Sequence, residues 1–361
     1  MSTRHYTLPV EQTRWHIPSG QTTTFSWEYD EGRDRLLTLY EKGKKRQWDA
    51  AQRIDWSLEV DPTNPLRAPE ETNPIYGSAT WARLPERERG IVRHHQTAWQ
   101  FSQFLHGEQG ALICASKIVQ TVPDIDSKFY AATQVIDEAR HVEAYSRYLH
   151  DKLDLAYPIN PHLKALLNDV VSDGRWDMTY LGMQVLIEGL ALAAFGLIRD
   201  LTPEPLAKSI NAYVMQDEAR HVAFGRLALR DYYKELTAKE RGEREEFCVE
   251  ACYLMRDRFL AEEMWNHLDG VVDAAECIAY VAGSETLQQF RSLLFSRIVP
   301  TLRDIGLFGA PVQRAFADMG VLGFQAVDVE ALMANDEQQA EGIDAERRRQ
   351  VDQAIALGTA G

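Results

Sequence analysis

The pentapeptide DEARH decides the fold, and the chain carries it twice, as DEARHVEAY at residues 137–145 and DEARHVAFG at residues 217–225. The two copies lie 80 positions apart. The same offset relates two upstream glutamates, Glu108 in FLHGEQGAL and Glu188 in VLIEGLALAAF, each 30 residues before the Glu of its pentapeptide. The chain therefore contains an internal repeat whose shared residues are mostly carboxylates and histidines.

A proline stands midway between the two glutamates of each copy. Pro123 divides the interval in the first copy and Pro203 in the second, each 15 residues from both glutamates. A proline between two helical stretches favours a turn. Because 15 residues of helix rise about 22 Å, an antiparallel hairpin folded at the proline returns the second Glu to the level of the first. The repeat thus predicts two helical hairpins, each offering one Glu and then a Glu-x-x-His.

Two such hairpins packed together bring four carboxylates and two imidazoles into one core, because a Glu and a His three residues apart share a helix face. This is the di-iron or di-manganese carboxylate set of ferritin-like four-helix bundles. Four carboxylates balance two divalent ions, whereas unpaired carboxylates in an apolar bundle would be very costly. The candidate catalytic and metal-binding residues are Glu108, Glu138, His141, Glu188, Glu218 and His221.

The alternative interpretation of the repeat is an old duplication of a helical hairpin whose polar residues face solvent. The surrounding segments, such as YAATQVIDEARHV and LGMQVLIEGLALAAFGLI, are largely apolar. Two equal spacings and two central turns, set in apolar helices, favour the metal site.

The other polar residues of the pentapeptides have a supporting role in this hypothesis. A metal-bound His usually donates its second ring N–H to a carboxylate. Asp137 and Asp217 are expected to accept that hydrogen bond from the His of the opposite hairpin, with Arg140 and Arg220 holding the aspartates. The alternative for these residues is an ordinary salt bridge at a helix surface.

Apolar residues one turn from the ligand glutamates are candidates for a dry substrate pocket beside the metals. A plain packing role is the alternative for each of them. The pocket candidates are Ala111, Leu112, Ala191, Leu192 and Phe195.

The composition sets limits on the remaining possibilities. A net charge of −15 excludes nucleic acid as a partner, since phosphate binding needs a basic surface. The four cysteines show no zinc-binding pattern and are expected to be reduced. The first residues lack an apolar signal-like core, and no apolar run approaches the roughly 20 residues of a membrane span, so we expect a cytoplasmic protein without a membrane partner.

The predicted fold class is all-α, a ferritin-like four-helix bundle with additional flanking helices, because apolar residues recur with the helical period and nowhere alternate with period two. Residues 1–84 are expected to form an irregular segment with one helix, over residues 33–54, packed on the bundle. Residues 85–335 form the helical di-iron domain. Residues 336–361 form a polar tail, either a solvated helix or disordered.

At the ligand positions the sequence resembles the catalytic α-subunit of bacterial multicomponent monooxygenases, the methane, toluene and phenol hydroxylases. It shares Gly107 before the first ligand Glu and both DE-x-RH motifs, and the resemblance covers roughly residues 95–235. More remotely the chain is similar to ribonucleotide reductase small subunits and the ligand-binding oxidases related to them. Two positions depart from these patterns: Leu192 replaces the Thr of the monooxygenases, and Tyr145 stands where the reductase subunits place their radical Tyr.

The resemblance implies an O2-activating di-iron oxygenase or oxidase, and a hydroxylating monooxygenase acting on a small organic substrate is the preferred hypothesis. Two iron ions are implied as cofactors, with manganese possible at one position. A separate reductase or ferredoxin is expected as electron donor, because no GxGxxG motif precedes a helix; a homodimer is also expected. The alternatives are a ferritin-like ferroxidase and a radical-carrying subunit, for which Tyr145 is the local hint and a core Tyr the simpler reading.

Overall fold

The computed structural model describes residues 34–356 together with Thr7, Gly20 and Thr23. Within residues 34–356 the chain forms helices and no strand, with one isolated bridge between Asp269 and Val272. The all-α class predicted from the sequence is therefore confirmed.

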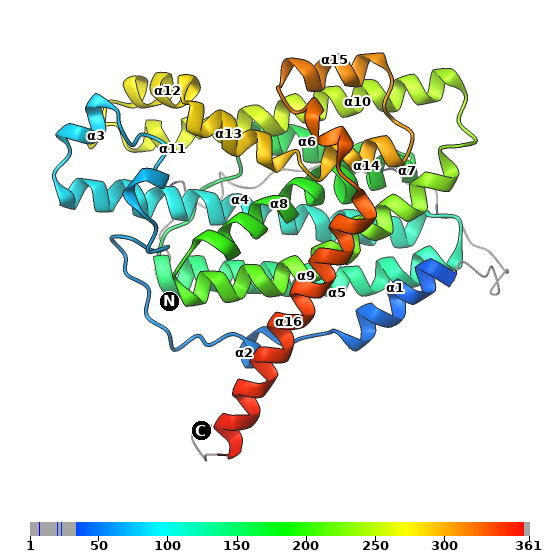
Figure 1. The fold of residues 1–361 in the computed structure, drawn as a ribbon, viewed down its shortest axis with the longest axis horizontal. Coiled ribbons are helices and arrows are strands. Elements are labelled where there is room, and N and C mark those ends of the chain that lie inside the picture. The colour runs from blue at the N-terminus through cyan, green and yellow to red at the C-terminus, as the bar shows by residue number, and fades with distance from the viewer. Residues whose placement is uncertain (1–6, 8–19, 21–22, 24–33, 357–361) are drawn as a thin grey trace.

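Two helical hairpins form the central bundle (Figure 1). In the first, α4 (Glu86–Thr121) packs along α5 (Ile125–Arg147). In the second, α8 (Glu188–Leu201) packs along α9 (Pro205–Tyr232). The helix containing α8 begins earlier, as α7 (Trp176–Tyr180), and continues through a π-helical stretch, η4 (Leu181–Ile187). The four-helix bundle expected from the repeat is thus present.

The prolines at the repeat midpoints end the first helix of each hairpin. Val122 before Pro123 and Thr202 before Pro203 both have extended backbones, with ψ of 138° and 128°, because a following proline disfavours the helical conformation. Capping side chains then start the return helices: Asp124 accepts from the Ser127 amide, and Glu204 accepts from the first amides of α9. Local sequence therefore defines both turns.

The other helices surround this bundle. Helix α1 (Asp34–Lys45) lies on α5 and α9, while α10 (Ala238–Asp257) covers α6 (Pro161–Ser172) and η4. The remaining elements are α2 (Ala50–Arg53), η2 (Glu70–Thr72), α3 (Ala79–Arg83), η3 (Tyr148–Leu153), η5 (Arg258–Leu260), α11 (Glu262–His267), α12 (Ala274–Gly283), α13 (Glu285–Leu294), α14 (Ile298–Asp304), α15 (Ala310–Asp318), η6 (Leu322–Ala326) and α16 (Val329–Ala356).

Both ends of the described chain differ from the sequence-based expectation. The single helix predicted over residues 33–54 is broken into α1 and α2, because residues 46–49 turn inward and bury Trp48. The polar tail is helical as far as Ala356, but its helix α16 begins at Val329, before the expected boundary, and crosses α9 (Figure 1). Residues 357–361 lie outside the described residues.

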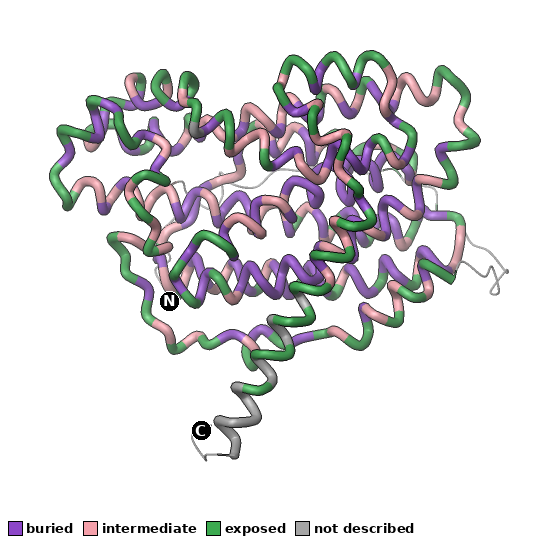
Figure 2. The backbone as a smooth tube through the Cα atoms, viewed as in Figure 1, coloured by how far each residue is buried: buried purple, intermediate pink, exposed green. Residues whose placement is uncertain are grey.

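Burial is concentrated in the bundle, as the purple segments of Figure 2 show. The helix from Trp176 to Leu201 has a mean hydropathy of 1.9 and is long and apolar enough to cross a membrane by length and composition alone. The sequence-based expectation of no membrane-length apolar helix is therefore wrong by this criterion. In the most apolar window of this helix, 78% of the residues are buried inside the protein. There the helix packs against several others, including α9 and α10.

Candidate metal centre

The six residues predicted as metal ligands come together at the centre of the bundle. Glu108 comes from α4, and α5 supplies Glu138 with His141. Glu188 is the first residue of α8, directly after the π-helical stretch, and α9 supplies the last pair. All six side chains are buried. Their ligand atoms form two groups in which every atom lies within 4.8 Å of the others: Glu108, Glu138, His141 and Glu218 in one, and Glu138, Glu188 and His221 in the other.

Two glutamates lie between the two histidines. The two oxygens of Glu138 point to different rings, Oε2 at 3.2 Å from His141 Nδ1 and Oε1 at 3.1 Å from His221 Nδ1. Glu218 Oε1 lies 3.2 Å from His141 Nδ1 and 3.4 Å from His221 Nδ1. Glu108 Oε2 approaches only the first ring, at 3.1 Å, and Glu188 Oε2 lies 3.9 Å from the second. Glu138 and Glu218 are therefore the two central carboxylates, each close to both rings, and Glu108 and Glu188 are the two outer ones, each close to one ring.

The far nitrogen of each histidine faces an aspartate of the other hairpin. His141 Nε2 lies 3.1 Å from Asp217 Oδ2, and His221 Nε2 lies 3.2 Å from Asp137 Oδ2. With its proton on Nε2, each ring donates to the aspartate and turns the lone pair of Nδ1 toward the carboxylates. Arg140 bridges both aspartates, with its Nη2 3.1 Å from Asp217 Oδ2.

Two further residues at this centre were not predicted from the sequence. Trp48 Nε1 donates to Asp217 Oδ2 at 2.7 Å, and its indole stacks on His141 with ring centroids 6.4 Å apart. Gln47 Nε2 donates to Asp137 Oδ1 at 2.8 Å. Both lie in the break between α1 and α2, outside the repeat, and no periodicity or spacing marks them.

Burial and like charge determine the electrostatics of the cluster. Burial, and then the charge of Glu218, raise the pKa of Glu108 and of Glu188 well above the usual range. Although burial opposes the charged form, the nearby His221 holds the pKa of Glu138 well below its usual value. Burial also opposes charge on His141, but Glu108 and the other carboxylates raise its pKa. Without a cation, Glu108 and Glu188 therefore hold their protons more tightly than separate carboxylates would.

Several polar atoms in the cluster have no hydrogen-bond partner among the described residues. Both carboxylate oxygens of Glu218, Glu188 Oε2 and His221 Nδ1 are fully buried and form no hydrogen bond, although the carboxylates and rings face one another. Buried polar atoms in folded proteins are almost always satisfied. Hard carboxylate oxygens with imidazole nitrogens suit iron or manganese, and a pair of such ions would satisfy these atoms. The donor set therefore fits two divalent metal ions.

Tyr145 lies beside the cluster without a recorded contact to its ligands. Its hydroxyl donates to Asn211 Oδ1 on α9 at 3.1 Å. Its ring packs against Phe104 and Phe195, with centroids 5.6 and 5.9 Å away. Burial, followed by the charges of Glu108 and Glu218, raises its pKa well above the usual range.

A narrow cavity of about 20 Å³ adjoins the cluster, and Ala111, Ala191 and Phe195 line it. The other two pocket candidates do not. Leu192 packs in the apolar core, and Leu112 is half-buried outside the cavity, because the cavity lies on the side of each glutamate that carries the residue three positions later, not four. The lining residues missed from the sequence are Gln103, Phe104, Gly107, Met183, Ile187 and Arg258. Phe104 lies four residues before Glu108 and so shares its helix face, whereas nothing in the sequence marks Arg258.

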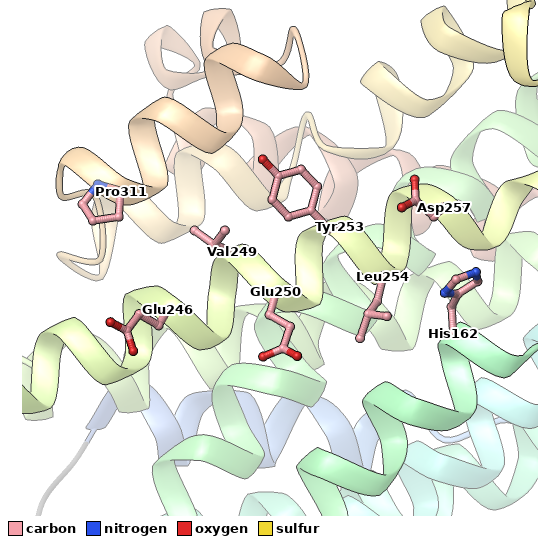
Figure 3. A pocket seen from close by; sticks show the side chains of 8 residues that line it. All are labelled: His162, Glu246, Val249, Glu250, Tyr253, Leu254, Asp257 and Pro311. Carbon is pink, nitrogen blue, oxygen red and sulfur yellow. The ribbon is translucent and has the colours of Figure 1, made fainter.

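A larger surface groove of about 460 Å³ runs along α10 (Figure 3). It is lined by α10 side chains such as Val249 and Tyr253, with His162 from α6 and Pro311 from α15 at its ends. None of the six candidate ligands borders it. The cavity at the cluster, although smaller, is therefore the one that adjoins the chemistry.

No curated protein gives a significant match. Similar solved structures include a mutant R2-like ligand-binding oxidase with anaerobically reconstituted Mn/Fe cofactor, 20% identical over 79% of this chain and 96% of its own, with a TM-score of 0.45. An aerobically reconstituted Mn/Fe form is 17% identical over 90% of this chain and 94% of its own, with a TM-score of 0.39.

The sequence matches the family described as P-aminobenzoate N-oxygenase AurF over residues 30–306. This match spans about three quarters of the 361 residues and includes both hairpins. The resemblance to oxygen-activating proteins of the ferritin-like di-iron superfamily is confirmed, and with it a metal pair of the di-iron type as cofactor. The chain belongs to the P-aminobenzoate N-oxygenase AurF family.

Proposed function

We propose that this di-iron oxidoreductase is an oxygenase that uses O2 to oxidise a small organic substrate beside its metal pair. The observation that carries the proposal is a single cavity that adjoins both the cluster and apolar side chains. Three of the six candidate ligands, Glu108, Glu188 and Glu218, border it together with Phe104 and Phe195. An iron-storage protein needs no such apolar cavity beside its metals, so the alternative of a ferroxidase is less well supported.

The metal pair would be held by the two groups of ligand atoms that meet at Glu138 and Glu218. When bound, two such ions supply the electrons and the coordination positions with which O2 is reduced. The protein's own contribution is to hold the ligands in place. Asp217 and Asp137 fix the orientation of the histidine rings, so that each Nδ1 faces the metal site.

The cavity leaves room for about one water beside the reacting groups. Phe104 and Phe195 contact each other with ring centroids 4.8 Å apart and close the cavity beside Tyr145. A dry site protects reactive oxygen species from side reactions and strengthens the electrostatic interactions within it. The ring of Tyr145 packs against both phenylalanines, and its hydroxyl is anchored to Asn211.

For the reaction type, N-oxygenation of an aromatic amine is our first candidate, because the family is named for the N-oxygenation of p-aminobenzoate. Carbon hydroxylation, the preference from the sequence alone, is the second. Electrons would come from a separate reductase or ferredoxin. A homodimer and a cytoplasmic location, both expected from the sequence, remain part of the proposal.

The test uses protein reconstituted anaerobically with Fe²⁺, then given O2 and a chemical reductant with p-aminobenzoate. We expect O2 consumption that depends on substrate, with a product heavier by one or two oxygen atoms in mass spectrometry and labelled when ¹⁸O2 is used. The control is the His221→Ala variant, which should consume O2 no faster than free iron. If O2 oxidises the iron once and no organic substrate from an amine and hydrocarbon panel is altered, the protein is a ferroxidase instead.

A further inference from the structure

Arg258 differs from every other buried arginine of the described residues. It exposes only 7% of its surface, its Nε is fully buried without a hydrogen-bond partner, and no side chain among residues 34–356 forms an ion pair with it. Its recorded contact is with the ring of Phe259, 5.0 Å away, which does not neutralise its charge. The other five buried arginines all have a carboxylate partner: Arg140 with Asp137, Arg199 with Asp200, Arg220 with Asp217, Arg226 with Asp304 and Arg244 with Asp177.

Arg258 borders the same cavity as three candidate ligands, Glu108, Glu188 and Glu218, without forming an ion pair with them. It begins the turn η5 at the end of α10. Trp265 Nε1 donates to the Leu260 carbonyl at 3.1 Å, and Ala261 ends the turn in the left-handed region at φ 52°. A non-glycine residue held in this conformation indicates that the surrounding structure fixes the turn.

The charges of the metal centre balance without Arg258. Four carboxylates offset two divalent ions, and Asp137 with Asp217 offset Arg140 with Arg220. Burial lowers the pKa of Arg258 to about 10, so its guanidinium is protonated at neutral pH. An uncompensated buried cation is costly, and a ligand carrying one negative charge would remove that cost.

We propose that Arg258 binds the carboxylate of the organic substrate and thereby directs the opposite end of that molecule toward the metal ligands. A guanidinium offers a planar fork of donors that matches a carboxylate with two parallel hydrogen bonds. The substrates are then small monocarboxylates with an apolar body, which suits the aromatic lining beside Arg258. The oxidation of the bound molecule rests on the proposed function, whereas its binding to Arg258 does not.

The cavity must widen to admit such a molecule. At about 20 Å³ it holds roughly one water. Gly107 gives it room to grow, since a Cβ there would meet no atom within 4 Å, and Gly107 and Ala191 are both partly exposed at the cavity. Met183, an unbranched and adaptable side chain in the lining, can change rotamer to open the space.

The test measures binding without turnover, in protein loaded with Mn²⁺ and kept free of reductant. Isothermal titration uses benzoate, p-aminobenzoate and hexanoate, each compared with its neutral amide. We expect wild type to bind at least one carboxylate about tenfold more tightly than the matching amide. Arg258→Met should abolish this preference and Arg258→Lys should retain part of it. The control, Arg256→Met, removes an arginine two residues earlier that is paired with Asp257 and should keep the preference.

Three results would overturn the proposal. One is a wild-type protein that binds no carboxylate of the panel better than its amide. Another is an Arg258→Met variant with an unchanged preference. The third is an Arg258→Met variant that melts below wild type or loses metal, since the side chain is then a structural cation. The proposal requires a melting temperature at or above wild type, with metal content unchanged.

A variant that fills the space beside the cavity tests whether the carboxylate binds there. Gly107→Leu fills the space beside the cavity and should weaken carboxylate and amide alike, leaving Arg258 in place. Tight binding in Gly107→Leu would put the carboxylate elsewhere and contradict the proposal. If the carboxylate binds through Arg258 but no oxygenated product forms, the proposed function fails and the binding role of Arg258 stands.

Discussion

Each histidine of the metal centre is oriented from the opposite hairpin, and the N-terminal segment adds a second layer of contacts. Asp217 accepts from His141, Trp48 and Arg140 at once, so three parts of the chain, α5, α9 and the segment between α1 and α2, meet at one carboxylate. Burial opposes the charge of Asp217, but Arg220 and His141 lower its pKa. A carboxylate with this many donors is held rigidly, and the ring of His141 is held with it.

Replacing Asp217 with Asn should therefore weaken metal binding more than folding. Asn keeps the shape but removes the charge that Arg140, Arg220 and the histidine share. We predict an affinity for one metal ion about 10–100-fold lower, measured by competition with a chelator. Asp200→Asn is the matched control, because Asp200 is exposed and also pairs with an arginine. Equal metal affinities in the two variants would contradict the proposed role of Asp217 in holding His141.

Substitution of Tyr145 distinguishes an oxygenase from a radical-carrying subunit. Its hydroxyl is bonded to Asn211, and the ring is packed between Phe104 and Phe195. Tyr145→Phe keeps the ring and its packing, so we predict little change in substrate-dependent O2 consumption. Electron paramagnetic resonance after O2 exposure of the reduced protein should show no persistent tyrosyl signal. A stable signal in wild type that disappears with activity in Tyr145→Phe would favour the radical subunit.

At the scale of helices, the two hairpins could be predicted from the sequence because the residues that determine each hairpin lie within it. Proline turns, equal spacing and the Glu-x-x-His pattern act within one hairpin, and so they could be read from residues 108–141 and 188–221 alone. The π-helical stretch before Glu188 and the break that buries Trp48 could not, because they depend on how distant elements pack. The lining role of Arg258 depends likewise on tertiary packing, since α10 lies outside the repeat.

The close approach of η4 to α9 depends on Gly225, the counterpart of Tyr145 in the second repeat copy. A Cβ at Gly225 would lie 2.5 Å from Cβ of Gln184. We predict that Gly225→Ala lowers the free energy of unfolding by about 1–3 kcal/mol, as overpacking does, in a urea titration. Gly242→Ala on α10 is the control, because its Cβ meets no atom within 4 Å and helical propensity favours alanine. Similar destabilisation by both changes would contradict this packing.

For the whole molecule, the metal pair links stability to pH. In metal-free protein the raised pKa values of Glu108 and Glu188 mean that folding favours their protonated forms, so stability is lost as pH rises above the unfolded-state value near 4.5. Metal binding requires the deprotonated forms and strengthens over the same range. The lowered pKa of Glu138 affects the stability of the protein only at pH values below the unfolded-state value.

We therefore predict that the melting temperature of metal-loaded protein exceeds that of chelator-treated protein by a margin that grows from pH 5 to pH 8. Differential scanning calorimetry at several pH values measures both forms. A Glu59→Gln variant, which alters an exposed glutamate far from the repeat, should show the same trend as wild type. A margin that stays constant across this range would mean that metals do not replace protons at the cluster.

Metal content tests the central claim most directly, that six buried residues of two repeated hairpins hold a metal pair. After anaerobic reconstitution with Fe²⁺ and removal of free metal, elemental analysis should find about two ions per chain. His141→Ala and His221→Ala should each lose about one ion while circular dichroism remains helical, since each ring is the nitrogen donor of its group. One zinc per chain, or no iron retained after reconstitution, would contradict the account.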